Sequence, residues 1–306
     1  MKKWIALSIV AACVCGSFLT IGLAARKKKG PPPKVVITGE VKHRFLASSY
    51  HGKVYIVDKD GKVEWEVKAP NAQDIFMLKG DRVLFNTRSG AQIVSVKDKK
   101  VLWEYKHESK EKFEIHSCQP LKNGNVLITV CGRSKVIEVD KDGKIAKEIK
   151  FAKVSKFAGN GHMELRDSVK TAKGTYLVAF LEEGVIREFD ADSKVVRTIK
   201  TDFFKRRGVS TIQVLKNGNL LIGGGYGKNA VEIDKDNKIV WSLEQKDIEG
   251  LKMGYVATAK RLDNGNTLIS LYHGSQAFFE VTKDKKMIWS IKGGPFHGTT
   301  AIEYLD

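Results

Sequence analysis

The sequence predicts an all-β fold, a six-bladed β-propeller of four-stranded blades. A strand–turn–strand signature recurs six times, a glycine-bearing hairpin turn recurs between its copies, and the C-terminal residues supply a strand that the first unit lacks. A period of 38 to 50 residues is typical of propellers and arrays, because one such unit cannot bury its apolar face alone. The second acidic residue of the six copies is Asp60, Asp98, Asp142, Asp192, Asp236 and Asp284.

Each unit is predicted to hold four short strands. The first ends in a turn such as Asn217-Gly218, a preferred hairpin turn because both of its residues adopt positive φ. An apolar second strand, a third strand and an Asp-Gly turn follow, and the fourth strand alternates with period two. Lys147 and Arg197 stand in two of the fourth strands where four others carry a tryptophan that we expect to pack between blades: Trp65, Trp103, Trp241 and Trp289.

The two ends of the repeat region predict how the ring closes. The first unit begins near Phe45 with the pattern of a second strand, and residues 297–304 resemble a first strand with nothing after it. Joining them completes the first blade and hides the edges that a linear array would expose. We therefore predict that the C-terminal strand completes the N-terminal blade.

The N-terminus has the pattern of a targeting segment over residues 1–25. Lys2 and Lys3 precede an apolar run at residues 4–25, which fits either a cleaved signal peptide or a membrane anchor of about 22 residues. The basic residues 26–29 favour an anchor, and residues 10–13 resemble a weak lipobox. These outcomes remain open, but each predicts an exported, periplasmic or envelope-associated protein. Residues 26–41 are predicted to be a basic, proline-rich linker, and residues 42–306 the propeller.

Charge and cysteine content narrow the function classes. The formal net charge is +18, but the first 34 residues hold seven basic residues and no acidic one. Most other lysines stand beside aspartates in turns, which is typical of a solvated surface, so we predict no nucleic-acid partner. Cys118 and Cys131 lie on neighbouring strands of one predicted hairpin with an offset that favours two buried thiols, although a disulfide remains open.

The repeat resembles the PQQ-like repeat family of bacterial β-propellers. The residues that carry the resemblance are 57–65, with their Asp, Gly and Trp spacing, and hairpins such as residues 214–222 also resemble arylsulfotransferase-type propellers. The resemblance implies a propeller over residues 42–306 and an envelope role in binding or assembly. PQQ-dependent dehydrogenases of this family use larger eight-bladed rings and an adjacent cysteine pair, which the repeat region lacks. We therefore predict no cofactor.

Binding residues are expected on one face of the ring. The turns between second and third strands and the links between units vary in length, whereas the remaining turns are short and uniform. Variable loops on a rigid scaffold commonly carry binding. Six of the seven histidines map to this variable face: His51, His107, His116, His162, His273 and His297.

Three interpretations remain open for His116, His162 and His297, which are predicted to begin channel-lining strands. They are structural groups bonded to neighbouring backbone, or a pocket that receives an anion, or a metal or catalytic site. The resemblance to arylsulfotransferase-type propellers places working histidines in such a channel. The complete set of candidate binding residues is His116, His162, His297, Arg206, Arg207, Tyr255, His273 and Tyr226.

We predict no metal site. The favoured hypothesis is a non-catalytic binding scaffold that takes a protein or an anionic glycan at its variable face, with a possible membrane tether through residues 4–25. The alternative is a channel-mouth enzyme that catalyses group transfer or hydrolysis with histidine and arginine. No motif in the sequence identifies a nucleophile elbow or a zinc-protease helix.

Overall fold

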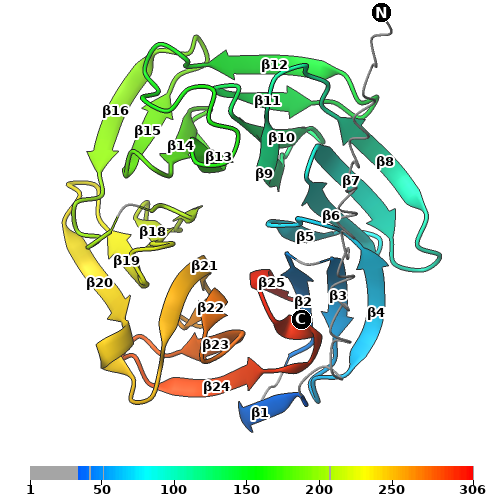
Figure 1. Cartoon of the computed structure of the whole chain (residues 1–306), viewed down its shortest axis with the longest axis vertical. Helices are drawn as coiled ribbons and strands as arrows, with labels where there is room; N and C mark the ends of the chain where they lie inside the picture. Colours follow the sequence, from blue (N-terminus) through cyan, green and yellow to red (C-terminus); the bar gives the residue numbers. More distant parts are fainter. Residues whose placement is uncertain (1–33, 41–42, 51, 207, 306) are drawn as a thin grey trace, which may run out of the picture. The chain divides into compact units, whose positions relative to one another are not determined.

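The computed structural model describes residues 34–40, 43–50, 52–206 and 208–305. Six antiparallel sheets surround a central channel, as the repeat predicted (Figure 1). No α-helix occurs in these ranges, and two short 3-10 turns, η1 (Gln245–Asp247) and η2 (Gly294–Phe296), lie in links between blades.

Each blade is numbered by chain order and described from its innermost to its outermost strand. The strands are β25 (Thr299–Tyr304), β2 (Phe45–Ser49), β3 (Lys53–Val57) and β4 (Val63–Lys68) in blade 1; β5 (Ile75–Leu78), β6 (Arg82–Thr87), β7 (Gly90–Ser95) and β8 (Val101–Lys106) in blade 2; β9 (Glu114–Pro120), β10 (Val126–Cys131), β11 (Lys135–Val139) and β12 (Ile145–Lys150) in blade 3; β13 (Leu165–Lys170), β14 (Tyr176–Phe180), β15 (Val185–Phe189) and β16 (Val195–Lys200) in blade 4; β17 (Thr211–Val214), β18 (Leu220–Gly223), β19 (Asn229–Ile233) and β20 (Ile239–Glu244) in blade 5; and β21 (Met253–Arg261), β22 (Thr267–Gly274), β23 (Phe278–Val281) and β24 (Met287–Lys292) in blade 6.

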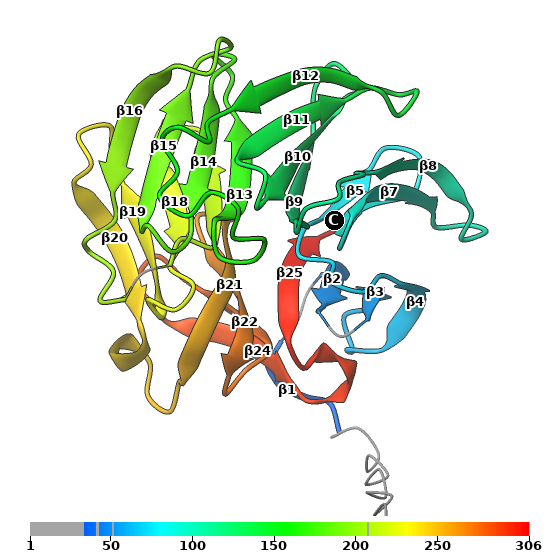
Figure 2. The same ribbon diagram turned by 45° about the horizontal axis from the view of Figure 1, so that its top comes forward.

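The C-terminal strand closes the ring. Strand β25 pairs with β2, so that Tyr304 lies opposite Phe45 and Ile302 opposite Ala47, and both strands belong to the sheet that holds Tyr55 (Figure 2). The prediction that the chain's tail completes its first blade is confirmed.

Blade 6 has a fifth strand that the sequence analysis placed in the linker. Residues Val36–Gly39 form β1, which pairs antiparallel with the outer strand β24 from Val36 opposite Lys292 to Gly39 opposite Trp289. This strand lies within residues 26–41, which the sequence analysis assigned to the linker. The short run Val-Ile-Thr is a β-favouring segment, and the edge of β24 offers its unpaired backbone groups to it.

The repeated Asp turn has a direct physical role. In blade 3, one oxygen of the Asp140 carboxylate accepts hydrogen bonds from the backbone N–H groups of Asp142 and Lys144, each at 2.9 Å. Gly143 adopts φ +76°, which a residue without Cβ reaches at low cost. Asp58, Asp190 and Asp234 make the same pair of bonds in their blades. The signature thus encodes a turn that satisfies its own backbone.

The core lies between the blades. Within the described residues, buried apolar side chains form six clusters, and each cluster joins two neighbouring blades. The outer-strand tryptophans contribute as predicted: Trp103 Nε1 donates to the backbone oxygen of Asp140 in the next blade (3.0 Å), and Trp241 Nε1 to that of Lys283 (2.8 Å). Cys118 and Cys131 are buried free thiols.

Inner strands are also joined by a recurring hydrogen bond. A polar side chain on one inner strand accepts the backbone N–H of the next inner strand, at five successive blade interfaces. The pairs, acceptor first, are Glu303 and Met77 (3.2 Å), Asp74 and Cys118 (3.1 Å), Gln119 and Lys170 (2.8 Å), Asp167 and Ile212 (2.7 Å), and Gln213 and Arg261 (2.6 Å). Neighbouring sheets do not share a strand ladder, so these bonds satisfy inner-strand amides that the ladder leaves unpaired.

Candidate functional site

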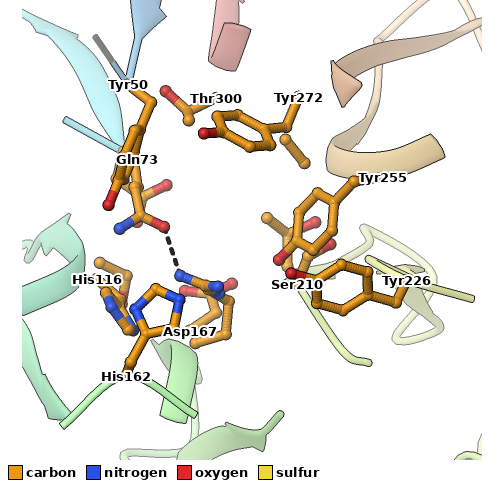
Figure 3. A pocket seen from close by; sticks show the side chains of 15 residues that line it. Tyr50, Gln73, His116, His162, Asp167, Ser210, Tyr226, Tyr255, Tyr272 and Thr300 are labelled. Atoms are coloured by element: carbon orange, nitrogen blue, oxygen red, sulfur yellow. Dashed lines mark hydrogen bonds between the residues drawn. The ribbon is translucent and has the colours of Figure 1, made fainter. Parts of the chain in front are cut away.

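A cavity of about 210 Å³ occupies the channel at its variable face (Figure 3). Its lining residues come from turns between second and third strands, such as Tyr50 and Tyr226, and from links between blades, such as Gln73 and His162. The cavity therefore lies between loops of the variable face and the inner strands.

Four tyrosines form one side of the cavity. Tyr226 and Tyr255 meet edge to face with ring centroids 4.8 Å apart, Tyr255 and Tyr272 lie 6.2 Å apart, and Tyr50 and Tyr272 lie 5.5 Å apart. Burial raises the pKa of Tyr255 and of Tyr272, so both remain neutral phenols at pH 7. The wall thus combines aromatic faces with hydroxyl groups that donate or accept hydrogen bonds.

Arg166, on the inner strand β13, brings a buried positive charge to this cavity. It is 9% exposed, its Nη1 donates to Gln73 Oε1 at 2.7 Å, and its Cζ lies 6.0 Å from the ring centroid of Tyr255. Within the described residues its Nε has no hydrogen-bond partner, and it forms no salt bridge with a carboxylate. A buried guanidinium without a counter-ion is costly unless a ligand supplies one.

Glu114, His116 and His162 form a compact cluster on the opposite wall. Glu114 and His116 lie two residues apart on β9, and His162 precedes β13 in the next blade. Glu114 Oε2 lies 2.9 Å from His116 Nε2 and 2.8 Å from His162 Nδ1. Figure 3 shows the two imidazoles side by side, across the cavity from Tyr255.

The electrostatics of this cluster are asymmetric. Burial, and then the charge of Arg166, lower the pKa of His116 to about 4. Burial acts to raise the pKa of Glu114, but its hydrogen bonds with His116 and His162 hold that pKa well below its usual range. His116 Nδ1 donates to the backbone oxygen of Leu165 at 2.7 Å, and its Nε2 faces the Glu114 carboxylate.

Two buried carboxyl groups lie deeper in the channel. Asp74 and Asp167 line this cavity and also a second one of about 780 Å³ toward the opposite face. Burial raises the pKa of Asp167 to about 6, and burial together with the proximity of Asp167 raises that of Asp74. Each accepts a backbone N–H of the next blade, so their first role is to join blades.

The structure brings together only part of the predicted residue set. His116, His162, Tyr226 and Tyr255 line the cavity. His273 and His297 are exposed and do not line it, because His273 stands at the end of β22 and His297 follows the turn η2 at the rim. The three channel histidines predicted as one group therefore do not share a point.

The predicted arginines lie elsewhere. Arg206 lies outside the cavity. Its Cζ is 5.6 Å from the centroid of the Tyr226 ring, and it lines a separate surface hollow with Lys205. Arg207 is not among the described residues. The charge inside the cavity comes instead from Arg166, which the sequence analysis missed.

Sequence signals for the missed residues do exist. Glu114 and His116 are two residues apart, so both side chains would share one face of any strand that included them. Arg166-Asp167-Ser168 is a polar run at a position where an apolar strand would be expected, which marks it as unusual for a sheet interior. The tyrosines carry no such pattern, because they reach the cavity from separate turns.

Comparison with protein families places a match on the first half of the chain. A family model of PQQ-type repeats, described as outer membrane protein assembly factor BamB, matches residues 28–172. That stretch is similar to this family. The match covers β1 to β13, which includes three strands of blade 1, all of blades 2 and 3 and the innermost strand of blade 4, and it agrees with the PQQ-like resemblance of the repeat.

Solved structures share the propeller fold. A protein of unknown function from Bacteroides caccae is 22% identical, with TM-score 0.74 over 85% of this chain and 97% of that one. A catalytically inactive virginiamycin B lyase from Staphylococcus aureus with quinupristin is 14% identical, with a TM-score of 0.58 over 88% of this chain and 90% of that one. The Cps50 (Swd1) propeller domain of Myceliophteria thermophila is also 14% identical, with a TM-score of 0.58 over 88% of this chain and 87% of that one. Identities this low establish the fold alone.

Neither a curated relative nor a membrane-spanning helix is found for the residues concerned. No curated protein matches the chain significantly. In the part of the chain that the structure describes, no helix is long and apolar enough to cross a membrane.

Proposed function

We propose that this protein is an exported, non-catalytic binding propeller of the bacterial envelope, and that its channel cavity receives the acidic sugar residue of an anionic glycan. The observation that carries the proposal is Arg166, a buried guanidinium that faces the cavity without a carboxylate partner among the described residues. A planar guanidinium binds carboxylate with two parallel hydrogen bonds.

The rest of the wall suits a sugar ring. The phenols of Tyr50, Tyr226, Tyr255 and Tyr272 and the side chains of Gln73, Ser210 and Thr300 surround the cavity. Polar groups distributed around a pocket match a ligand with hydroxyls on every side, and aromatic rings cover the apolar faces of such a ligand. The volume of about 210 Å³ accommodates a terminal unit and not a long chain, so the glycan would enter by its end.

Two other observations support an envelope role. The family model that matches residues 28–172 is described as an outer membrane protein assembly factor, and the N-terminal sequence has the pattern of an export segment. The separation of the predicted histidine triad supports the non-catalytic part of the proposal, because His297 lies outside the cavity. Group transfer at the channel mouth, the arylsulfotransferase-like alternative, would need another set of residues.

The test is titration calorimetry with glucuronate- and galacturonate-terminated disaccharides against their neutral counterparts. Acidic sugars should bind, and Arg166→Gln should weaken binding at least tenfold. Arg82→Gln is the matched control, because Arg82 lies at a turn on the opposite face and should leave affinity unchanged. Equal affinity for neutral sugars, or an unaffected Arg166→Gln variant, would contradict the proposal.

A further inference from the structure

The strongest unassigned feature is the convergence of two imidazoles and a carboxylate on one point. His116 Nε2, His162 Nδ1 and a Glu114 oxygen all lie within 4.8 Å of one another. We propose that Glu114, His116 and His162 bind one divalent transition-metal ion, with zinc as the expected occupant, in the wall of the channel cavity.

The hydrogen bonds of His116 select the ligating nitrogen. Its Nδ1 donates to the backbone oxygen of Leu165 at 2.7 Å, and the ring is fully buried between blades 3 and 4. A carbonyl acceptor of this kind fixes the orientation of a metal-binding histidine and leaves the other nitrogen to the metal. Here the other nitrogen, Nε2, points at Glu114 Oε2 across 2.9 Å.

Both histidines approach the same carboxylate oxygen. His116 Nε2 lies 2.9 Å and His162 Nδ1 lies 2.8 Å from Glu114 Oε2. Without a metal these contacts are hydrogen bonds donated by the two rings, because a carboxylate oxygen has two lone pairs that can accept them. A metal ion would replace these protons and bond to all three groups at once.

Glu114 is held in place by its second oxygen. Arg88 Nη2 lies 3.3 Å from Glu114 Oε1, so Oε2 remains the oxygen shared with the two histidines. Partners of this type, one step removed from the metal, orient ligating carboxylates. Each ligand of the proposed site except His162 is therefore fixed by a contact outside the cluster.

The donor set indicates the class of metal. Two imidazoles and one carboxylate suit zinc and other first-row transition ions, and not calcium or magnesium, which prefer oxygen ligands. With bonds of about 2.1 Å, ligand atoms in a tetrahedral site lie about 3.4 Å apart. The separations of 2.9 and 2.8 Å between the carboxylate oxygen and the two nitrogens would widen by about half an ångström, and the two nitrogens, which lie within 4.8 Å of each other, would adjust to a similar distance. The half-exposed His162, on the link before β13, permits that movement.

The site would leave one coordination position open toward the cavity. Both histidines line the cavity that Arg166 enters, and three protein ligands are typical of zinc sites that also bind a small molecule. This step rests on the proposed function: the sugar carboxylate would bridge the metal and the Arg166 guanidinium. The metal then contributes to affinity without any catalytic step.

Metal binding is tested on the full-length protein after dialysis against a chelator. Zinc titration by calorimetry should show one equivalent, and cobalt should give a visible absorption band typical of a low-coordinate site. His162→Ala and Glu114→Gln should each weaken zinc binding at least tenfold. His273→Ala, which alters an exposed histidine outside the cavity, should not change it.

The outcomes separate the two proposals. No zinc binding, or unchanged binding in His162→Ala, overturns the metal site. His162 is half-exposed on a link, so that variant stays informative even if Glu114→Gln is poorly folded. Zinc binding without acidic-sugar binding overturns only the proposed function. Arg166→Gln should retain zinc binding, since Arg166 is not a ligand.

Discussion

The hydroxyl groups of Ser48 in β2 and Thr300 in β25 lie 2.8 Å apart, although 252 residues separate them in the chain. Thr300 Oγ1 also lies 2.6 Å from the backbone oxygen of Ala72, at the entrance to blade 2. This buried contact marks the point where the tail of the chain joins its first blade and the blade beside it.

Deletion of residues 297–306 should therefore destabilise the entire propeller. It removes β25, including the buried Ile302, and leaves the edge of β2 unpaired. We expect the melting temperature to fall by more than about 10 °C, because a loss of several kcal/mol shifts a domain of this size by that amount. Deletion of residue 306 alone is the control. An unchanged melting temperature for the long deletion would contradict the closure.

The buried Asp167 should make stability depend on pH. Burial raises its folded pKa to about 6, above the unfolded value of 3.8, so the folded state holds an extra proton between these values. The protonated Asp167 therefore contributes stability that is fully present below about pH 4 and is lost as the pH rises through about 6. The free energy of unfolding should fall by on the order of 1 to 3 kcal/mol over this range.

Asp167→Asn should remove this contribution to the pH dependence of the free energy of unfolding. The asparagine oxygen can still accept the N–H of Ile212, so the blade contact is kept. Denaturant melts at pH 5 and pH 8 should then differ less than in the wild type, with the variant the more stable at pH 8. Asp81→Asn, at an exposed turn, is the control. A steeper pH dependence in Asp167→Asn would refute the argument.

Two outer-strand tryptophans form a matched pair. Trp65 and Trp241 are buried to a similar degree, at 7% and 8% exposed, but only Trp241 donates its Nε1 hydrogen, to Lys283 in the next blade. Trp65 Nε1 has no hydrogen-bond partner among the described residues. Trp241→Phe should cost about 1 kcal/mol more than Trp65→Phe, because it alone loses a hydrogen bond and leaves a carbonyl unpaired. Equal losses in urea unfolding would count against this contact.

Gly39 should be required for the fifth strand of blade 6. Its φ is +81°, and a Cβ there would lie 2.1 Å from the backbone oxygen of Ile288. Gly39→Ala should detach β1 and speed hydrogen exchange at the amides of β24, with a destabilisation of about 1 kcal/mol or more. Gly124→Ala is the control, since it has a similar φ of +87° and open space around the added methyl. Unchanged exchange in β24 would exclude a role for Gly39.

The blade count and ring closure could be predicted because they depend on local chemistry. Asp140 and its equivalents satisfy their own turns, and the outer strands alternate with period two, so residue type and position suffice. The missing first strand of the first unit then left residues 297–304 as the one segment that could complete it.

The site could be predicted only in part, because it depends on bulges and loops. Strand pairing shifts register between Thr129 and Val130 and between Leu165 and Ser168, so alternation cannot tell that Arg166 reaches the cavity. His297 follows η2, which directs the chain along the rim. The fifth strand β1 was missed because a four-residue strand after a proline-rich segment has little local signal.

The placement of β1 on the last blade has a mechanical consequence. A force applied to the chain before Val36 acts first on the ladder between β1 and β24, and reaches β2 only after β1 has peeled away. Loss of β1 would still leave six closed four-stranded sheets. The fifth strand would therefore protect the pairing of β2 with β25 from tension applied to the chain before Val36.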